Sequence, residues 1–324
     1  MKKILVTLPV TAEQKKLYAD TAPEAEFIFC RKEEVTAEMV GSLTAVIGNI
    51  PPSMLAENQA IEWVQLNSAG TDGYLAEGVL SETAVLTNAT GAYGVGIAEH
   101  MTGQLLMLFK KFPVYLENQK LHIWKDAGTV RSICGSRILI VGMGDIGTEF
   151  AVRMKAFGAY VAGLRRTVRE KPACVDEMDT IDNLERQLAL ADVVAVCLPG
   201  TKETFHMFSV RQFAAMKEGA VFLNVGRGNV VDTEALVDAL KTGKLSGASI
   251  DVCEKEPLPG EEELWDCPNL LLTPHVSGGF HLKYTVDRIV DISLKNLNVY
   301  INGGEYLSVV DRRTGYKISG SVSG

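Results

Sequence analysis

The chain has 324 residues, of which 47% are hydrophobic and 22% are charged, so it can form two globular domains with substantial cores. Its formal net charge of −8 argues against nucleic acid and anionic membranes as partners. No apolar run approaches the roughly 18 residues of a membrane span, and Met1-Lys2-Lys3 leads into a strand pattern instead of a signal sequence.

The cysteines are spread along the chain, and no two of them form the C-x-x-C pair of a redox or metal motif. Cys197 lies inside an apolar run that is typical of a buried strand. We therefore expect reduced thiols in a cytoplasmic protein, and a site without a metal ion.

Residues 1–90 alternate short apolar runs with helical or turn segments, a pattern that predicts a parallel α/β sheet. One amphipathic helix is predicted at Thr11–Ala22. Strands are predicted at Lys2–Leu8, Glu26–Cys30, Ala45–Ile50, Trp63–Leu66 and Ala84–Thr87. The small-residue turn at Ser68–Gly70 follows the fourth strand, and it is either a loop whose backbone N–H groups bind an anion or a simple strand-to-helix turn.

A glycine-dense segment, Thr90–Gly96, is predicted to cross between two domains. It leads into a long predicted helix, Ile97–Val114, with apolar residues on more than one face. Such a helix must be covered on both sides, either by two domains or by a second subunit.

The most informative stretch is Ser136–Gly147, which reads S-R-I-L-I-V-G-M-G-D-I-G. A buried strand pattern at Arg137–Val141 is followed by a G-x-G-x-x-G motif, by a helical pattern and by a second strand. Gly142 permits a tight turn, Gly144 permits the approach of a pyrophosphate, and Gly147 permits close packing of the helix on the strand. The helix N-terminus would offer its free N–H groups to the phosphates. This order of elements predicts binding of a nicotinamide dinucleotide.

Six strands are predicted in this second half, as a doubly wound sheet requires, at Arg137–Val141, Tyr160–Leu164, Val193–Leu198, Ala220–Val225, Ala248–Asp251 and Leu270–Leu272. A second long helix, His281–Ile301, is expected to return to the first domain and make it discontinuous. We therefore expect a first domain of residues 1–97 plus 287–324, and a dinucleotide-binding domain of residues 98–286.

Three further stretches end predicted strands, so their side chains should meet at the carboxyl edge of the sheet. Arg227 lies between two glycines, and its guanidinium group can bind a carboxylate through two hydrogen bonds. Glu256 follows the fifth strand, and His275 follows the sixth. Each residue alone could be structural, but the three together beside a nucleotide site favour catalysis.

These motifs, taken in order, resemble the D-isomer-specific 2-hydroxyacid dehydrogenase family, which includes phosphoglycerate dehydrogenases and glyoxylate/hydroxypyruvate reductases. The matching segments span nearly the whole chain: Ser68–Gly70, Ala98–His100, Gly142–Gly147, Asn224–Gly228, Asp251-Val252, Glu256–Pro259 and Pro274–Gly278. The resemblance implies two α/β domains with doubly wound parallel sheets, a Rossmann dinucleotide-binding domain and a flavodoxin-like substrate domain. It also implies hydride transfer between NAD(P)H and a small 2-oxo acid.

The resemblance assigns roles to individual residues. His275 would exchange the hydroxyl proton, Glu256 would stabilise the protonated His275, and Arg227 would bind the carboxylate of the substrate. The substrate would also contact Ser68, Ala69 and Gly70. The implied cofactor contacts are Gly142, Gly144, Asp145, Ile146, Gly147, Arg165, Arg166, Cys197, Leu198, Pro199, Thr204, Val225, Gly226, Asp251, Ser277 and Gly278.

The second strand ends in Gly163-Leu164-Arg165-Arg166, where NAD-preferring proteins place an acidic residue. Two guanidinium groups suit the 2′-phosphate of NADP, and no carboxylate at this position repels it. NADP is therefore favoured over NAD, and the alternative is a pair of solvated arginines with NAD as the cofactor.

No cluster of Lys or Arg lies near Ser68 or Tyr93, which favours glyoxylate or hydroxypyruvate over phosphoglycerate as the substrate. A phosphoglycerate dehydrogenase remains an alternative, as does, from another class, a nicotinamide-sensing binding protein or corepressor with this fold. Glu256 argues against a formate dehydrogenase, which has a glutamine there. The resemblance further implies a homodimer through Ile97–Trp124, while His100 is expected to be structural.

Overall fold

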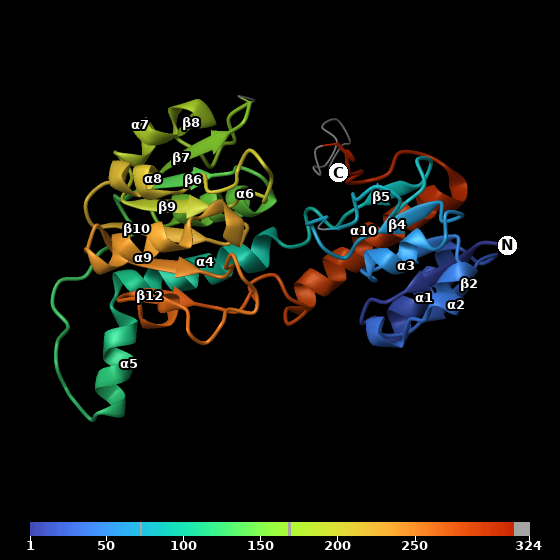
Figure 1. Ribbon diagram of the computed structural model, residues 1–324, viewed down its shortest axis with the longest axis horizontal. Helices are drawn as coiled ribbons and strands as arrows, with labels where there is room; N and C mark the ends of the chain where they lie inside the picture. The colour runs from blue at the N-terminus through green and yellow to red at the C-terminus, as the bar shows by residue number, and fades with distance from the viewer. Residues whose placement is uncertain (72, 168–169, 314–324) are drawn as a thin grey trace. The chain divides into compact units, whose positions relative to one another are not determined.

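The computed structural model describes residues 1–71, 73–167 and 170–313, which form two units (Figure 1). One unit contains residues 1–93 and 280–313, and the other contains residues 94–279. The boundaries expected after residues 97 and 286 lie inside helices α4 (Gly94–Phe109) and α10 (Lys283–Asn302). The chain instead changes unit just before each helix, because a helix is one continuous hydrogen-bonded segment that stays with one core.

The first unit holds a five-stranded parallel sheet in the order β2-β1-β3-β4-β5, the flavodoxin-like order. Its strands are β1 Lys3–Val6, β2 Glu26–Phe29, β3 Ala45–Ile47, β4 Trp63–Gln65 and β5 Val85–Thr87. Its helices are α1 Ala12–Thr21, α2 Ala37–Gly41, α3 Pro52–Ala56 and α10. Four neighbouring strands contribute fully or almost fully buried side chains to its core, namely Leu5, Val46, Val64 and Leu86.

A buried polar network attaches α10 to this sheet. The amide nitrogen of Asn296, a residue with no exposed surface, donates to Gln65 Oε1 at 2.7 Å, and Asn296 Oδ1 accepts from the backbone N–H of Leu307 at 2.7 Å. The polar groups of Asn296 are thereby satisfied inside the core. The first unit is therefore built from two separate stretches of the chain.

The second unit holds a seven-stranded parallel sheet in the order β12-β11-β10-β9-β6-β7-β8, the Rossmann order with one added strand. Its strands are β6 Arg137–Val141, β7 Tyr160–Arg165, β8 Glu177–Thr180, β9 Val193–Val196, β10 Ala220–Asn224, β11 Leu245–Ile250 and β12 Leu270–Leu272. Its helices are α4, α5 Phe112–Lys120, α6 Asp145–Ala156, α7 Leu184–Leu188, α8 Val210–Ala215 and α9 Thr233–Lys241. Both predicted doubly wound sheets are confirmed.

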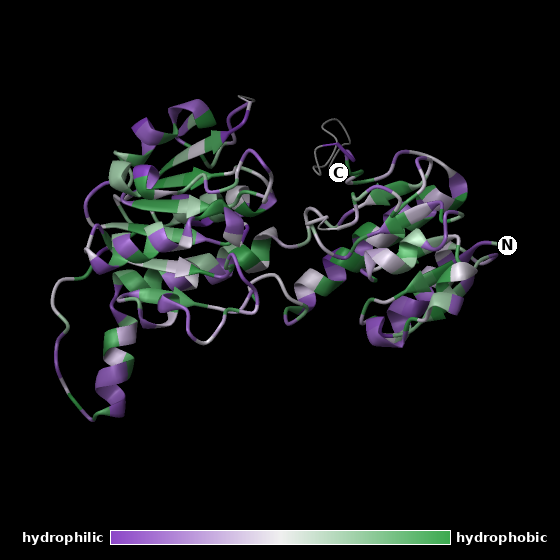
Figure 2. Ribbon diagram, in the orientation of Figure 1, coloured by the Kyte–Doolittle hydropathy of each residue, from purple (hydrophilic) through white to green (hydrophobic). Residues whose placement is uncertain are grey.

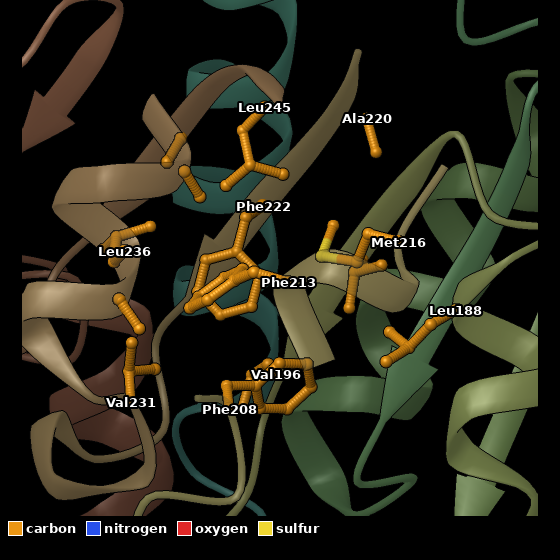
Figure 3. Close-up of a cluster of buried hydrophobic side chains, with 14 of the residues drawn as sticks. Leu188, Val196, Phe208, Phe213, Met216, Ala220, Phe222, Val231, Leu236 and Leu245 are labelled. Carbon is orange, nitrogen blue, oxygen red and sulfur yellow. The ribbon is translucent and has the colours of Figure 1, made fainter. Parts of the chain in front are cut away.

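Most strands of both sheets are built from hydrophobic residues, which are green in Figure 2. In the second unit, Phe222 of β10 packs against Phe208 and against Phe213 of α8, with both pairs of ring centroids 5.2 Å apart (Figure 3). This cluster fixes β10 against its covering helices, and β10 carries Arg227 at its carboxyl end. No helix in the described part of the chain is long and apolar enough to cross a membrane.

Strand β8 was not predicted from the sequence. Its residues read E-M-D-T and are only half buried. β8 is at the edge of the sheet and lacks the apolar run by which the other strands were recognised. Burial raises the pKa of Asp179 in this strand, but hydrogen bonds from Asn183, Gln187 and Arg186 outweigh it and lower that pKa to about 2. Charged side chains of this kind protect a sheet edge from pairing with another chain.

The long helix predicted at Ile97–Val114 is two helices. Lys111 between them has a φ of 57°, in the left-handed region, and Pro113 lies in the first turn of α5, where its missing N–H does no harm. Helix α4 packs on α6 within its own unit, whereas α5 has no buried residue. Exposed large apolar residues lie on α5 and on the segment after it, among them Phe112, Leu121 and Trp124.

Candidate active site

Two glycines of the G-x-G-x-x-G motif are required by the protein itself. Gly142 has a φ of 104°, and a Cβ atom there would lie 2.7 Å from the carbonyl oxygen of Cys197. A Cβ atom on Gly147 would lie 2.2 Å from the carbonyl oxygen of Gly142. The first contact joins the ends of β6 and β9, and the second joins the first turn of α6 to the end of β6. The strand order reverses between β6 and β9, where doubly wound sheets bind their ligands.

Gly144 is different, because no protein atom lies within 4 Å of where its Cβ atom would be. Its φ of −87° is open to any residue, so neither the backbone nor the packing demands glycine here. The space in front of it adjoins the first turn of α6, where backbone N–H groups lack helical acceptors. An open cradle at a helix N-terminus fits the pyrophosphate of a dinucleotide.

Several predicted cofactor contacts use their side chains inside the protein. The Asp145 carboxylate accepts from the backbone N–H of Gly94 at 2.9 Å, and so joins α6 to α4. The hydroxyl of Thr204 accepts from the N–H of Thr201 at 2.8 Å and donates to Pro199 at 2.7 Å. Burial raises the pKa of the Cys197 thiol to about 12, so this thiol stays uncharged. These side chains shape the loops that carry them.

The two arginines lie at the carboxyl end of β7, beside the glycine turn. Arg165 Nε donates to the carbonyl oxygen of Met143 at 2.8 Å, and Arg166 is exposed. A carboxylate that sequence reasoning missed acts on this position through its charge: the pKa of Glu203 is lowered, mainly by a hydrogen bond with Thr201 and to a smaller extent by the charge of Arg166. Glu203 lies 37 positions after Arg166 in the sequence, so the spacing of the two residues gave no sign that their charges interact.

Glu256 and His275 are brought together as expected. His275 Nδ1 lies 2.7 Å from Glu256 Oε2, and Glu256 Oε1 accepts from the backbone N–H of Cys253 at 2.9 Å. Both side chains are partly exposed. With Nδ1 engaged by the carboxylate, Nε2 is the imidazole atom that can exchange a proton with a bound molecule.

Arg227 is placed by close contacts between neighbouring loops. A Cβ atom on Gly226 would lie 2.3 Å from the carbonyl oxygen of Leu198, and one on Gly228 would lie 2.0 Å from the carbonyl carbon of Cys253. The loops after β9, β10 and β11 therefore touch backbone to backbone. This contact sets the Arg227 loop against the loop that carries Glu256.

Asp251, which the sequence indicated as a cofactor contact, also has a structural role. This residue is 1% exposed, and its carboxylate accepts from Thr273 Oγ1 at 2.6 Å, Val276 N at 3.0 Å, Ser277 N at 3.1 Å and Ser277 Oγ. Its backbone carbonyl accepts from the N–H of His275 at 2.8 Å. Four hydrogen bonds use the full acceptor capacity of a carboxylate, so Asp251 holds the segment around His275 in place.

The Ser68–Gly70 turn in the first unit is a fixed loop. The hydroxyl of Ser68 donates to the carbonyl of Gly70 at 2.7 Å and accepts from Asn49 at 3.0 Å, and Asn88 donates to the carbonyl of Ala69 at 2.7 Å. Among the described residues, no acceptor faces the N–H groups of Ala69 and Gly70. A rigid turn with available N–H groups can bind a carboxylate.

The contrast between Gly144 and Gly147 gives a testable prediction. Gly144→Ala should leave the thermal unfolding temperature nearly unchanged but weaken NADPH binding about tenfold or more, because the new methyl group occupies the cradle. Gly147→Ala should instead destabilise the protein by about 1–3 kcal/mol, because its methyl group meets backbone. Thermal unfolding and NADPH fluorescence titration measure both effects. Unchanged NADPH affinity in Gly144→Ala would contradict the assignment of this turn.

Comparison with known proteins identifies the family of the chain. Residues 102–277 match the family model of the D-isomer specific 2-hydroxyacid dehydrogenase, NAD binding domain. The chain is 31% identical over 277 residues to a probable 2-ketogluconate reductase of Dictyostelium discoideum, and the match covers 82% of this chain and 81% of that protein.

Two solved structures are similar along nearly the entire chain. A D-isomer specific 2-hydroxyacid dehydrogenase family protein from Aeromonas salmonicida has a TM-score of 0.85 at 32% identity, with 96% of this chain and 99% of that chain covered. An NADPH-dependent glyoxylate/hydroxypyruvate reductase from Sinorhizobium meliloti, solved with NADP and sulfate, has a TM-score of 0.82 at 25% identity, with 98% and 100% covered. The chain therefore belongs to the D-isomer specific 2-hydroxyacid dehydrogenase family and is an oxidoreductase with a domain for a nicotinamide cofactor.

Proposed function

We propose that the protein reduces a small, unphosphorylated 2-oxo acid of the glyoxylate or hydroxypyruvate type to the D-2-hydroxy acid. The observation that carries this proposal is the hydrogen-bonded pair of Glu256 and His275 at the carboxyl edge of the sheet that bears the dinucleotide motif. Relatives named glyoxylate reductase and glyoxylate/hydroxypyruvate reductase support the substrate class.

His275 is the proton donor in this proposal. Its Nε2 delivers a proton to the carbonyl oxygen of the substrate, while Glu256 at Nδ1 stabilises the positive charge of the imidazole before transfer. Arg227 binds the carboxylate of the substrate and fixes the orientation of the carbonyl group. When bound, the nicotinamide supplies the hydride. The glycine turn at Gly142–Gly147 and the first turn of α6 would hold its pyrophosphate.

The N–H groups of Ala69 and Gly70, with Ser68 as the residue that shapes their turn, are proposed to bind the same carboxylate. The side chains that brace this loop, Asn49, Asn88 and Tyr93, are all uncharged in their normal state. Burial raises the pKa of Tyr93 further above its usual value. A neutral surrounding favours an acid without a phosphate group over phosphoglycerate.

NADP is the proposed cofactor, with NAD as the alternative. Arg165 and Arg166 stand where the adenosine ribose is read in this fold, and they would bind a 2′-phosphate. The charge of Glu203, whose pKa Arg166 helps to lower, works against them, because it opposes the negative charge of the phosphate. Cofactor preference is thus a balance between two cationic side chains and one anionic side chain.

The apolar surface on α5 and the segment after it supports a homodimer. Seven large apolar residues there are at least 42% exposed: Phe112, Val114, Leu116, Leu121, Ile123, Trp124 and Val130. Figure 1 shows α5 and this segment extending away from the rest of their unit. Seven exposed apolar residues within one short part of the chain favour an interface, and a second copy of the chain is the partner we propose.

The catalytic proposal predicts different defects for two substitutions. His275→Ala should lower turnover with glyoxylate or hydroxypyruvate by about 10²–10⁴-fold, with NADPH affinity nearly unchanged, because only the proton donor is lost. Glu256→Gln should move the alkaline limit of kcat/KM to lower pH, because the amide no longer favours the charged imidazole that reduction requires. Steady-state kinetics across pH measures both, with the exposed Glu261→Gln as the control. An unchanged alkaline limit in Glu256→Gln would remove this pair from the mechanism.

The cofactor proposal predicts a selective loss. Replacing Arg165 and Arg166 together with Gln should weaken NADPH more than NADH by roughly 1–3 kcal/mol, because only NADPH loses charged hydrogen bonds. Glu203→Gln should act in the opposite direction and strengthen NADPH. Titration of each variant with both cofactors measures the difference. An equal loss for NADPH and NADH would show that the arginines do not bind the 2′-phosphate.

The dimer proposal predicts a dimer by sedimentation velocity at micromolar concentration, with an interface of about 1,600 Å² or more. Leu121→Glu combined with Trp124→Glu should shift the protein toward the monomer, because each places a charge in the apolar surface. Val210→Glu, a similarly exposed apolar residue on α8, serves as the control. A wild-type monomer at this concentration would contradict the proposal.

A further inference from the structure

Helix α4 carries two polar residues toward the segment that holds His275. His100 and Gln104 are four residues apart, so they lie on one face of α4. Their Nε2 atoms lie 3.2 Å and 3.4 Å from the hydroxyl oxygen of Thr273. Nearby, Leu108 continues the same face, and its side chain would meet a Cβ atom built on Gly247 of β11.

The hydroxyl group of Thr273 determines which atoms carry hydrogen. A threonine hydroxyl has one hydrogen, and the 2.6 Å bond to Asp251 Oδ1 uses it, because an ionised carboxylate is only an acceptor. Thr273 Oγ1 must then accept from α4, so Nε2 of His100 bears a hydrogen. The result is a directed chain of hydrogen bonds from His100 through Thr273 to Asp251.

The chain ends at the backbone of His275. Asp251 accepts from the N–H groups of Val276 and Ser277, and its carbonyl accepts from the N–H of His275. His275 has a φ of 52°, a left-handed conformation that is unfavourable for a residue with a side chain. That conformation persists only where the surrounding bonds impose it.

We propose that His100 and Thr273 are positioning residues, which act through Asp251 to hold His275 in the orientation needed for proton transfer. This rests on the proposed function of His275. Neither residue touches the reacting atoms in this account. Their loss therefore lowers the rate of the chemical step without weakening the binding of NADPH.

Paired substitutions test the proposal. Thr273→Val and His100→Leu should each lower kcat for the 2-oxo acid about tenfold, with the NADPH dissociation constant changed less than twofold. Thr273→Ser keeps the hydroxyl group and His100→Gln keeps an Nε2 donor, so both should recover most of the lost rate. Because the two residues act along one chain of bonds, the double variant Thr273→Val/His100→Leu should be no slower than the worse single variant.

The matched control is Thr102→Val on the same helix. The hydroxyl of Thr102 donates to the carbonyl of Ala98 in its own helix, so the kcat of this variant should stay near that of the wild type. Multiplied defects in the double variant, or a rise of KM with unchanged kcat, would overturn the proposal. So would failure of the two conservative variants to recover the rate.

A spectroscopic measurement separates this proposal from the proposed function. The chain has five histidines, so the imidazole ¹⁵N signals of His275 can be assigned by their loss in His275→Gln. Thr273→Val should shift or broaden those signals, and Thr273→Ser should not. If the wild type reduces no 2-oxo acid but these shifts occur, the proposed function fails and the positioning role stands. If Thr273→Val leaves the His275 signals unchanged, the positioning role fails whatever the activity.

Discussion

The buried carboxylate of Asp251 is the group on which the geometry of the candidate site depends. An ionised carboxylate removed from water is unfavourable unless hydrogen bonds replace its hydration, and here four donors do so. Three of those donors belong to Val276 and Ser277, directly after His275 in the sequence, and the fourth belongs to Thr273, two residues before it. The requirement to satisfy one charge therefore dictates the path of the chain around the proposed proton donor.

The other loops of this edge are fixed by a different constraint, which is the absence of side chains. At Gly142, Gly147, Gly226 and Gly228, neighbouring backbone lies where a Cβ atom would be. These contacts bring the loops after four strands into one compact edge. Gly144 alone in the fingerprint faces open space, so the fold does not require glycine there, in contrast to Gly142 and Gly147.

Strongly periodic or apolar segments could be predicted from the sequence. The strand at Arg137–Val141 agrees with the structure at both ends, because a buried parallel strand is a continuous apolar run between turn residues. Strand β8 was missed because its polar residues form an edge, and the break at Lys111 was missed because a lysine rarely adopts positive φ. The edge position of β8 depends on tertiary structure, whereas Pro113 is a local signal of the break at Lys111 that the expected single helix did not take into account.

Within the site, the pairing of Glu256 with His275 followed from motif order and strand ends. The hydrogen-bond partners of Asp251, Asp145 and Thr204 did not, because a side chain at the edge of a sheet can face either a ligand or a neighbouring loop. Glu203 and Arg166 are a similar case, since their charges influence one another although the residues are distant in the sequence. Sequence patterns locate such residues, and only the packed loops determine which groups their side chains bind.

The central claim is that this site transfers hydride to a small 2-oxo acid and does not merely bind a nicotinamide cofactor. The most direct measurement follows NADPH and NADH oxidation with a panel of 2-oxo acids and analyses the product on a chiral column. The account predicts one 2-hydroxy acid formed for each NADPH oxidised. Hydroxypyruvate is the substrate for the chiral analysis, because glyoxylate gives an achiral product, and its product should be the D-isomer. Tight cofactor binding without oxidation by any 2-oxo acid would contradict it and indicate a nicotinamide-sensing binding protein.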